Sequence, residues 1–209
     1  AIDFIIETAR AHRGELVIAM VGPQTNLAAA LEREPQLARW LREITIMGGS
    51  TTLGNITPAA EFNIYCDPEA AAIVFGCGAP IRMVGYNVTR ETGFTRADVD
   101  RMKASGRTVA STVADLMAFY LDRQLSVYGL DVAPMHDVCA LIPYVAAGLI
   151  VDVATNVQVE LAGTHTRGAT VCDLRGVRPG ATEQIRAPAH ANARVALAAN
   201  GRTLIDLVV

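Results

Sequence analysis

Three short apolar runs, each with a glycine at or near its end, constrain the fold more than any other feature of the sequence. The first is ELVIAMVG (15–22), which leads through Gly-Pro and a Thr25-Asn26 helix cap into the helical segment LAAALERE. The others are EITIMGG (43–49) and APIRMVGYNVT (79–89). Strands that alternate with helices form parallel sheets, because each helix returns the chain to the starting edge. We therefore predict an α/β fold with an open, mainly parallel sheet flanked by helices.

Helical patterns occupy much of the remaining sequence. The N-terminal segment AIDFIIETARAH has an apolar stripe at helical spacing. Asp67-Pro68-Glu69 is a typical helix start, with Asp as the cap and Pro at the first position. Further helices are predicted at 95–104, at 108–127 and from about His136 to Ala147. The tail segments NVQVELAG, RGATVCDL and ARVALAAN alternate like antiparallel or edge strands, and no linker divides the chain, so we expect one domain over residues 1–209.

Composition excludes several classes of protein. With 51% hydrophobic and 19% charged residues, the chain can fill a core on both faces of a sheet. A net charge of -3 and scattered Lys and Arg residues give no basic stripe for nucleic acid. No apolar run approaches the roughly 20 residues of a membrane span, and the four cysteines are widely spaced, as in a reducing compartment. We expect a cytoplasmic protein that binds neither nucleic acid nor membrane.

Polar residues gather after the second predicted strand, at the end of the sheet where ligands bind in open α/β folds. The loop MGGSTTLGN lacks the Lys-Ser/Thr pair of a phosphate-binding loop. It leads instead to Asn55, Glu61 and Asn63, which can hydrogen-bond neutral hydroxyls and so favour a polyol or a sugar. Period-two alternation puts Glu61 and Asn63 on one face of an extended segment. The solvent-exposed face of an edge strand would explain two polar residues at this spacing as well as a ligand site does.

His136 and Asp137 stand at the start of an apolar segment that is predicted to be helical. An Asp in this position can simply cap free backbone N–H groups. Its carboxylate could also ligate a hard cation such as Ca²⁺, which prefers oxygen ligands. In that case His136 would be a proton donor or carrier that works near neutral pH.

Read together, the segments VGPQTNLAAAL, ITIMGGSTTLGN and TPAAEFNIYCDPEAA and the His-Asp pair resemble the nucleoside hydrolase family, with order and spacing preserved over nearly the whole chain. The resemblance implies a Rossmann-like nucleoside hydrolase fold and cleavage of the N-glycosidic bond of a small-molecule ribonucleoside to ribose and free base. It also implies bound Ca²⁺, held in part by the main-chain carbonyl of Val21 and the carboxylate of Asp137. We further expect a homo-oligomer, either a dimer or a tetramer.

The resemblance assigns roles to individual residues. Asn55 and Glu61 match residues that hold the ribose 5′-hydroxyl, Asn63 matches one that binds the lower hydroxyls, and Met47 matches one that lines the sugar site. His136 matches the histidine near the leaving base. Many hydrogen bonds to ribose suit a reaction that passes through an oxocarbenium-like state, because they position the sugar.

Gln124 and Tyr128 are the candidates for base specificity. They are four residues apart, hence on one helix face, and they precede His136 by twelve and eight residues. This spacing is similar to that of the pyrimidine-preferring members, whose Gln and Tyr meet the base. An ordinary amphipathic helix remains the alternative explanation.

One hallmark of the family, the N-terminal segment D-x-D-x-G-x-D-D, is absent from the 209 residues. With it are missing the catalytic-base Asp and most carboxylates of the Ca²⁺ site, so the chain resembles the C-terminal two-thirds of the enzyme. The absence of the first strands is expected to expose a hydrophobic sheet edge. We expect this chain alone to be inactive unless a partner chain or an N-terminal segment supplies the missing strands. A non-catalytic riboside-binding or structural fragment is the alternative.

Overall fold

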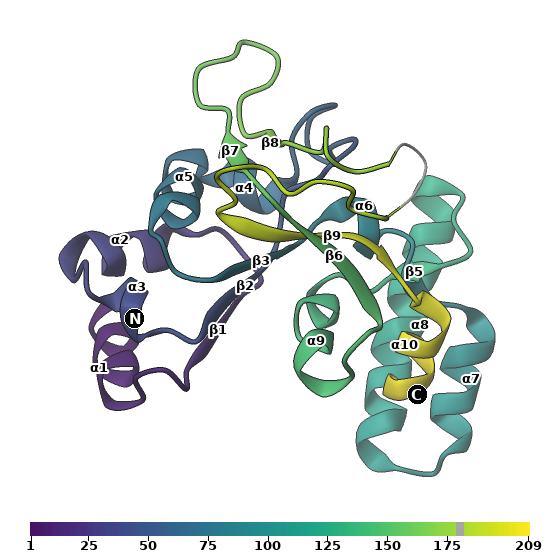
Figure 1. The fold of residues 1–209 in the computed structure, drawn as a ribbon. Coiled ribbons are helices and arrows are strands. Elements are labelled where there is room, and N and C mark those ends of the chain that lie inside the picture. The colour runs from purple at the N-terminus through teal and green to yellow at the C-terminus, as the bar shows by residue number, and fades with distance from the viewer. Residues whose placement is uncertain (179–181) are drawn as a thin grey trace.

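The structure, a computed structural model, describes residues 1–178 and 182–209. Within these residues the central sheet has the strand order β1-β2-β3-β9-β6 (Figure 1). Its strands are β1 (Val17–Met20), β2 (Glu43–Met47), β3 (Ile81–Val84), β9 (Ala193–Ala199) and β6 (Ile150–Thr155). The first four are parallel, and β6 pairs antiparallel with β9. The prediction of an open, mainly parallel α/β sheet is therefore confirmed.

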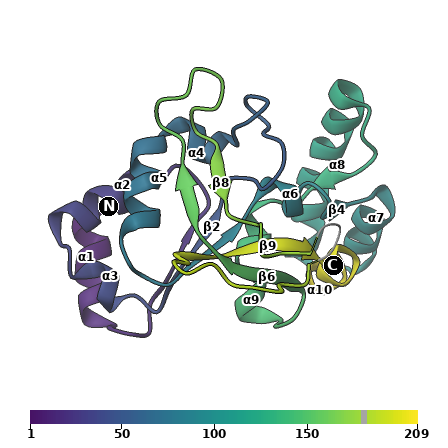
Figure 2. The same ribbon diagram turned by 45° about the horizontal axis from the view of Figure 1, so that its top comes forward.

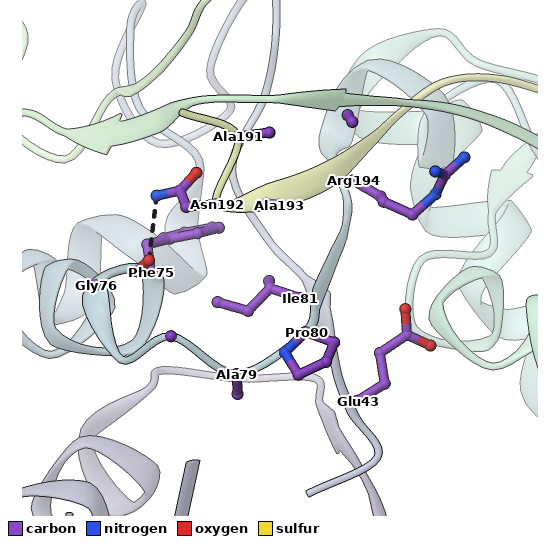
Figure 3. Close-up of a pocket in the computed structure, with 12 residues that line it drawn as sticks. Glu43, Phe75, Gly76, Ala79, Pro80, Ile81, Ala191, Asn192, Ala193 and Arg194 are labelled. Atoms are coloured by element: carbon purple, nitrogen blue, oxygen red, sulfur yellow. Dashed lines mark hydrogen bonds between the residues drawn. The ribbon is translucent and has the colours of Figure 1, made fainter. Parts of the chain in front are cut away.

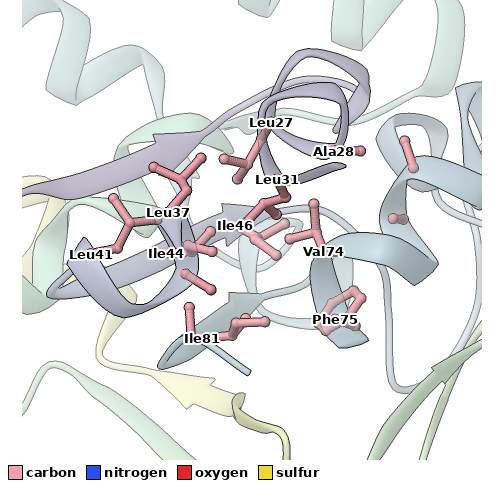
Figure 4. Packing of buried hydrophobic residues seen from close by; sticks show 14 of the residues in the cluster. Leu27, Ala28, Leu31, Leu37, Leu41, Ile44, Ile46, Val74, Phe75 and Ile81 are labelled. Carbon is pink, nitrogen blue, oxygen red and sulfur yellow. The ribbon is translucent and has the colours of Figure 1, made fainter. Parts of the chain in front are cut away.

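One face of the sheet carries the larger hydrophobic core. Ile44 and Ile46 of β2 and Ile81 of β3 are buried on this face (Figure 4). Met83 of β3 and Val195 of β9 belong to the same core. The helices that cover it are α1 (Ile2–Ala11), α2 (Thr25–Arg33), α3 (Leu37–Trp40) and α5 (Pro68–Gly76). Burying each such side chain contributes about 1.5–3 kcal/mol, so this core anchors the strands that lead to the polar loops.

The opposite face of β2 holds the His136-Asp137 segment against the sheet. Thr45 lies between Ile44 and Ile46, and its buried hydroxyl donates to the carbonyl of Ala140 over 2.8 Å. Ala140 ends the 3₁₀ helix η1 (Asp137–Ala140), which is followed by α9 (Ile142–Val145). The pair that begins this segment is thereby fixed to the centre of the sheet.

A second hydrophobic cluster lies beyond β9 (Figure 1). It is built around Phe94, Val99, Met102 and Leu204, all of which are buried. The elements that contribute to it include α6 (Tyr86–Thr89), β4 (Gly93–Phe94), α7 (Arg96–Ala104), α8 (Thr108–Tyr128) and α10 (Gly201–Val208). The strand β5 (Ala133–Pro134) pairs with β4. The antiparallel pair of β4 and β5 links α7 and α8 to the His136 segment, because Met135 and His136 follow β5 directly.

A hairpin of β7 (Val157–Val159) and β8 (Thr170–Cys172) projects from the sheet beside α4 (Phe62–Cys66) (Figure 2). Its Thr170 hydroxyl accepts from the backbone N–H of Ser50 over 2.9 Å and donates to the carbonyl of Ser50 over 2.8 Å. The hairpin therefore fixes the loop that follows β2. In the described part of the chain, no helix combines the length and the apolar character that a membrane crossing requires.

Three predictions of local structure are wrong. The segment Phe62–Cys66, interpreted as extended, is the helix α4, because Glu61 caps its first turn. The segment from His136 to Ala147 is not one helix but η1 followed by α9, since Pro143 lacks the N–H that a continuous helix needs there. The third predicted strand ends at Val84, and its last residues, Tyr86–Thr89, form α6.

The tail segments predicted as antiparallel or edge strands follow the first alternative: β7 pairs antiparallel with β8, and β9 pairs antiparallel with β6. β9 lies inside the sheet, between β3 and β6. One smaller prediction needs correction. The helix α2 begins at Thr25 with Gln24 at the cap position and without a side-chain cap, so Thr25 and Asn26 lie inside it. In contrast, Asp67 does cap α5, since its carboxylate accepts from the N–H of Ala70 over 3.1 Å.

Candidate functional site

The carboxyl ends of the parallel strands β1, β2 and β3 lie at the same end of the sheet, since the strands run in the same direction. Val21, Met47 and Gly85 are the residues at or just after these strand ends. Val21 is 43% exposed, whereas Met47 is 3% exposed. The loop that follows Met47 carries most of the polar residues predicted to bind a ligand.

Glu61 is a buried helix cap. Its carboxylate accepts from the backbone N–H groups of Asn63 over 3.0 Å, of Ile64 over 3.3 Å and of Gly49 over 2.9 Å. Burial raises the pKa of Glu61, and the hydrogen bonds from the backbone offset part of this effect. Glu61 thus ties the loop after β2 to the start of α4.

Asn63 and Met47 form a second link between β2 and α4. The side-chain amide of Asn63 donates to the carbonyl of Met47 over 2.9 Å. Among the described residues, the side-chain oxygen of Asn63 accepts no hydrogen bond, although the residue is only 9% exposed. The side-chain oxygen of Asn63 therefore remains a free acceptor near the carboxyl end of β2.

Asn55 completes the first turn of α4. Its side-chain oxygen accepts from the N–H of Phe62 over 2.8 Å, and Asn55 itself is exposed. The loop depends on Gly49, which has a φ of +70° and whose missing Cβ would lie 2.8 Å from the side chain of Thr170. Asn55 therefore has a fixed position on the surface of a tightly held loop.

A cavity of about 530 Å³ opens above this loop and brings together residues from four segments. Four of the residues predicted from the sequence line it, namely Asn55, Gln124, Tyr128 and His136. The rest of its wall consists mainly of aromatic and apolar side chains, from Ile56, Phe62, Tyr86, Leu130 and Pro134. A space of this size with a few polar groups is typical of a small-molecule site.

His136 lies in this cavity beside Tyr86 and Thr89. The ring centroids of His136 and Tyr86 are 5.9 Å apart, and Nδ1 of His136 lies 2.8 Å from the hydroxyl of Thr89. Burial lowers the pKa of His136 below its usual value, and the neighbouring Asp137 carboxylate offsets part of this effect. The imidazole is therefore fixed on one side and open to the cavity on the other.

Gln124 and Tyr128 come from the last turns of α8, as predicted. Gln124 is 9% exposed and Tyr128 is 65% exposed, so one is held in the wall and the other lies at the opening. Burial raises the pKa of Tyr120, and a hydrogen bond to the Gln124 side chain acts in the opposite direction. The Tyr120 and Gln124 side chains therefore lie close together on α8.

The remaining predicted residues do not line the cavity. Met47, Glu61 and Asn63 are buried at its border, where they build the loop and the start of α4. Val21 and Asp137 are both exposed. Within residues 1–178 and 182–209, no three His, Cys, Asp or Glu side chains are grouped so that they could hold a metal ion. One carboxylate and one carbonyl do not make the roughly six to eight oxygen ligands of Ca²⁺.

Phe62, Tyr86 and Thr89 belong to the site but were not predicted from the sequence. Phe62 was overlooked because the alternation of an extended segment places it on the face away from Glu61 and Asn63. Tyr86 and Thr89 follow β3, and the rule that ligands bind beyond the carboxyl ends of strands could have found them. Both residues lie within the third predicted strand (79–89), so the prediction does not place them beyond a strand end.

A second cavity of about 540 Å³ lies at the other end of the sheet, near the amino ends of β2, β3 and β9 (Figure 3). Its polar groups already have partners. The Asn192 amide donates to the carbonyls of Phe75 and Val157, and Glu43 accepts from the hydroxyl of Tyr144. Arg194 is paired with Asp152. The first cavity, with free groups on Asn55, His136 and Tyr128, is the better candidate for chemistry.

Comparison with known proteins agrees with this geometry. The family model described as inosine-uridine preferring nucleoside hydrolase matches residues 1–206. The pyrimidine-specific ribonucleoside hydrolase RihA of Enterobacter sp. (strain 638) is 42% identical over 186 residues, which are 87% of this chain and 59% of that protein. The RihA of Salmonella arizonae is 40% identical over 189 residues, 88% of this chain and 61% of that protein. The chain thus spans about three fifths of these relatives.

Two solved structures share the fold over nearly the whole chain. A plant nucleoside hydrolase, the PpNRh1 enzyme, has a TM-score of 0.86 and 31% identity, covering 99% of this chain and 64% of that one. A purine-preferring ribonucleoside hydrolase from Gardnerella vaginalis has a TM-score of 0.85 and 30% identity, covering 99% of this chain and 63% of that one. One of these two structures is named purine-preferring, whereas the sequence relatives above are named pyrimidine-specific.

Proposed function

Because the chain belongs to the inosine-uridine preferring nucleoside hydrolase family, we propose that it supplies the base-binding and ribose-binding parts of a ribonucleoside hydrolase with a preference for uridine and cytidine. The observation that carries this proposal is the cavity in which Asn55, Gln124, Tyr128 and His136 meet. These residues come from the loop after β2, from α8 and from the start of η1.

The base is proposed to lie between α8 and His136. The Gln124 amide offers a donor and an acceptor to the edge of a pyrimidine ring, and the exposed Tyr128 ring can close over it. Aromatic side chains of Tyr86 and Phe62 add an apolar wall for a planar ring. The identity to pyrimidine-specific relatives supports this preference.

The ribose is proposed to lie toward the carboxyl ends of the strands. Asn55 is exposed at the cavity, and Asn63 keeps an unused side-chain oxygen near Met47. Oε2 of Glu61 already accepts from the backbone N–H groups of Gly49, Asn63 and Ile64, whereas Oε1 accepts only from Asn63 and can accept a further hydrogen bond from a ribose hydroxyl. These groups would position the sugar while the bond at C1′ breaks.

In the proposed reaction, water adds to C1′ of the ribose and the bond from C1′ to the base breaks, giving ribose and free base. The electron pair of the broken bond goes to the base, so a donor near the base stabilises the transition state. His136 is proposed as that donor and Gln124 as the residue that orients the ring, since both line the cavity. Since no three His, Cys, Asp or Glu side chains of the described residues are grouped as a metal site, the carboxylate that activates the water is proposed to come from the Asp-rich segment of the complete site.

Calcium is proposed as the cofactor of the complete site, in which it would orient the water and the ribose hydroxyls. Asp137 and the Val21 carbonyl are the groups of this chain that would contact it. The described residues do not fit a calcium shell by themselves, so we expect the 209-residue chain alone to be inactive. A homo-oligomer in a reducing, cytoplasmic setting remains part of the proposal.

The test compares two proteins: the 209-residue chain and a longer protein in which an Asp-rich segment precedes Ala1. Release of ribose from uridine, cytidine and inosine is measured with Ca²⁺ and with a chelator. We expect turnover only in the longer protein with Ca²⁺, and faster turnover of the pyrimidine nucleosides. Failure of the longer protein to release ribose from any nucleoside would contradict the proposed function.

The alternative, a non-catalytic riboside-binding or structural fragment, is favoured by the lack of a metal-binding group among the described residues. Titration calorimetry separates the possibilities. Binding of uridine by both proteins without any release of ribose supports a binding protein. An intact mass of the natural material, which reveals whether an Asp-rich segment is attached, provides an independent check.

A further inference from the structure

The hydrogen bond between Thr89 and His136 joins two distant segments. Thr89 Oγ1 lies 2.8 Å from Nδ1 of His136, and the two residues are 47 positions apart in the chain. Thr89 ends α6, just after the carboxyl end of β3, and it is 0% exposed. Either atom could be the donor in this contact, so the other partners of each group decide the direction.

The partners of Thr89 settle which atom donates. Among the described residues its hydroxyl has no other hydrogen-bond partner, and its burial keeps water away. If Nδ1 of His136 carried a proton, the hydroxyl proton of Thr89 would be buried without an acceptor, which is unfavourable. If the hydroxyl donates to an unprotonated Nδ1, both groups are satisfied. A neutral imidazole then carries its proton on Nε2.

The Nε2 atom of His136 is open to the cavity. In the described part of the chain, the buried side-chain polar atoms without a hydrogen-bond partner are Gln24 Oε1 and Arg82 Nε. His136 Nε2 makes no hydrogen bond within the same residues, yet it is not one of these buried atoms, so it is accessible to solvent. Since His136 lines the cavity, a ligand can reach this nitrogen.

We propose that Thr89 is a positioning residue that fixes His136 in the tautomer with its proton on Nε2, so that an N–H donor faces the ligand before any ligand binds. The part of this donor in catalysis rests on the proposed function, whereas the tautomer itself does not. In the reaction, the preset N–H donates a hydrogen bond to the base as negative charge builds up on it. A donor that needs no reorientation stabilises such charge most effectively.

The tautomer can be measured without substrate by ¹⁵N NMR of the histidine-labelled 209-residue chain, at a pH well above the usual histidine pKa of about 6.5. The chain has four histidines, and His12, His165 and His190 are exposed, so they serve as internal references for an unbiased ring. We expect His136 to show the Nε2–H tautomer more completely than these three. A spectrum of the Nδ1–H tautomer would overturn the proposal.

Variants of Thr89 test whether this residue causes the Nε2–H tautomer of His136. Thr89→Val should bring the tautomer ratio of His136 close to that of the exposed histidines, and Thr89→Ser should restore the wild-type ratio. The matched control is Thr92→Val, because Thr92 is also buried but donates to the carbonyl of Val88 and does not contact His136. An unchanged ratio in a folded Thr89→Val protein would also overturn the proposal. If that variant does not fold, the wild-type and Thr89→Ser spectra still decide.

The catalytic consequence is tested in the form of the protein that cleaves uridine. Thr89→Val should lower kcat by about tenfold, a fraction of the roughly 100-fold or more that a positioned proton donor contributes, with KM changed less. Thr89→Ser should recover most of this loss. A normal kcat in a Thr89→Val protein whose tautomer has shifted would overturn the catalytic role alone. Absence of uridine cleavage in every form would count against the proposed function and leave the tautomer assignment standing.

Discussion

The guanidinium of Arg202 contacts both carboxylate oxygens of Asp98, over 2.7 Å and 3.2 Å, and thereby fastens α10 to α7. The Asp98 side chain is 2% exposed, whereas that of Arg202 is 52% exposed. Asp98 also accepts from the N–H of Thr95 over 3.0 Å and so closes the first turn of α7. One carboxylate therefore joins the C-terminal helix to the cluster that supports α8 and the cavity.

Acid is expected to weaken this connection. The Arg202 guanidinium, with help from Thr95, lowers the pKa of Asp98 to about 2. Because the folded state holds its proton less tightly than the unfolded chain, the contribution is complete above about pH 4 and is lost as the pH falls toward 2. Urea unfolding at several pH values should therefore show stability falling in this window.

The variant Asp98→Asn should remove much of this pH dependence and lower stability by about 2 kcal/mol, the scale of hydrogen bonds to charged groups. Asp100→Asn, an exposed change on the same helix, is the control and should leave both the stability and its pH dependence unchanged. Equal pH profiles for Asp98→Asn and the wild type would show that Asp98 is not the responsible group.

Glu61→Gln separates the structural role of this residue from a role in ligand binding. The amide oxygen of Gln can replace Oε2, but its NH₂ group then takes the place of Oε1 and faces the N–H of Asn63, so two donors meet in a buried site. We expect a loss of stability of about 1–3 kcal/mol in thermal or urea unfolding. Glu91→Gln, an exposed change, should have no such effect. Unchanged stability together with weaker uridine binding would instead assign Glu61 wholly to the ligand.

The parallel strands could be predicted from the sequence because strands buried on both faces are continuous apolar runs. The strand β6 was missed because Asp152 interrupts its apolar pattern. In the fold this carboxylate is paired with Arg82 and Arg194, which lie 70 and 42 residues away. No local pattern reveals such partners.

The same limit applies to the candidate site. Asn55, Gln124, Tyr128 and His136 could be found from order and spacing, and the structure does bring them to one cavity. The conformation of the segment from Phe62 to Cys66 could not be found, because a five-residue helix is too short to show helical periodicity. The contact between Thr89 and His136 depends on how α6 packs against η1, which only the folded chain shows.

Association through the edge of the sheet is expected to depend on β1. This strand pairs with β2 on one side and ends the strand order of the described sheet on the other. Unpaired strand edges favour association, and a lysine on the edge opposes it. Val17→Lys should therefore reduce concentration-dependent light scattering. Val109→Lys, on the exposed side of α8, adds the same charge elsewhere and should not. Equal scattering by both variants would exclude β1 as the contact.

Asp137→Ala tests the proposed metal contact. Asp137 is exposed and makes no side-chain hydrogen bond among the described residues, so the change should shift Tm by less than about 2 °C. In the form of the protein that contains an Asp-rich segment, we expect lower Ca²⁺ content and slower uridine cleavage. Asp131→Ala, which removes another exposed carboxylate, is the control. Unchanged Ca²⁺ content in Asp137→Ala would remove this residue from the metal site.

Gln124→Ala tests the preference for pyrimidines. The Gln124 amide is held in the cavity wall next to Tyr120, so its loss removes a donor and an acceptor that a pyrimidine edge can use. In the form of the protein that cleaves nucleosides, KM for uridine should rise about tenfold, as expected for one hydrogen bond of about 1.4 kcal/mol, and KM for inosine should rise less. Leu125→Ala is the control, because Leu125 is 54% exposed and does not line the cavity. Equal increases for both nucleosides would show that Gln124 supports the cavity without choosing the base.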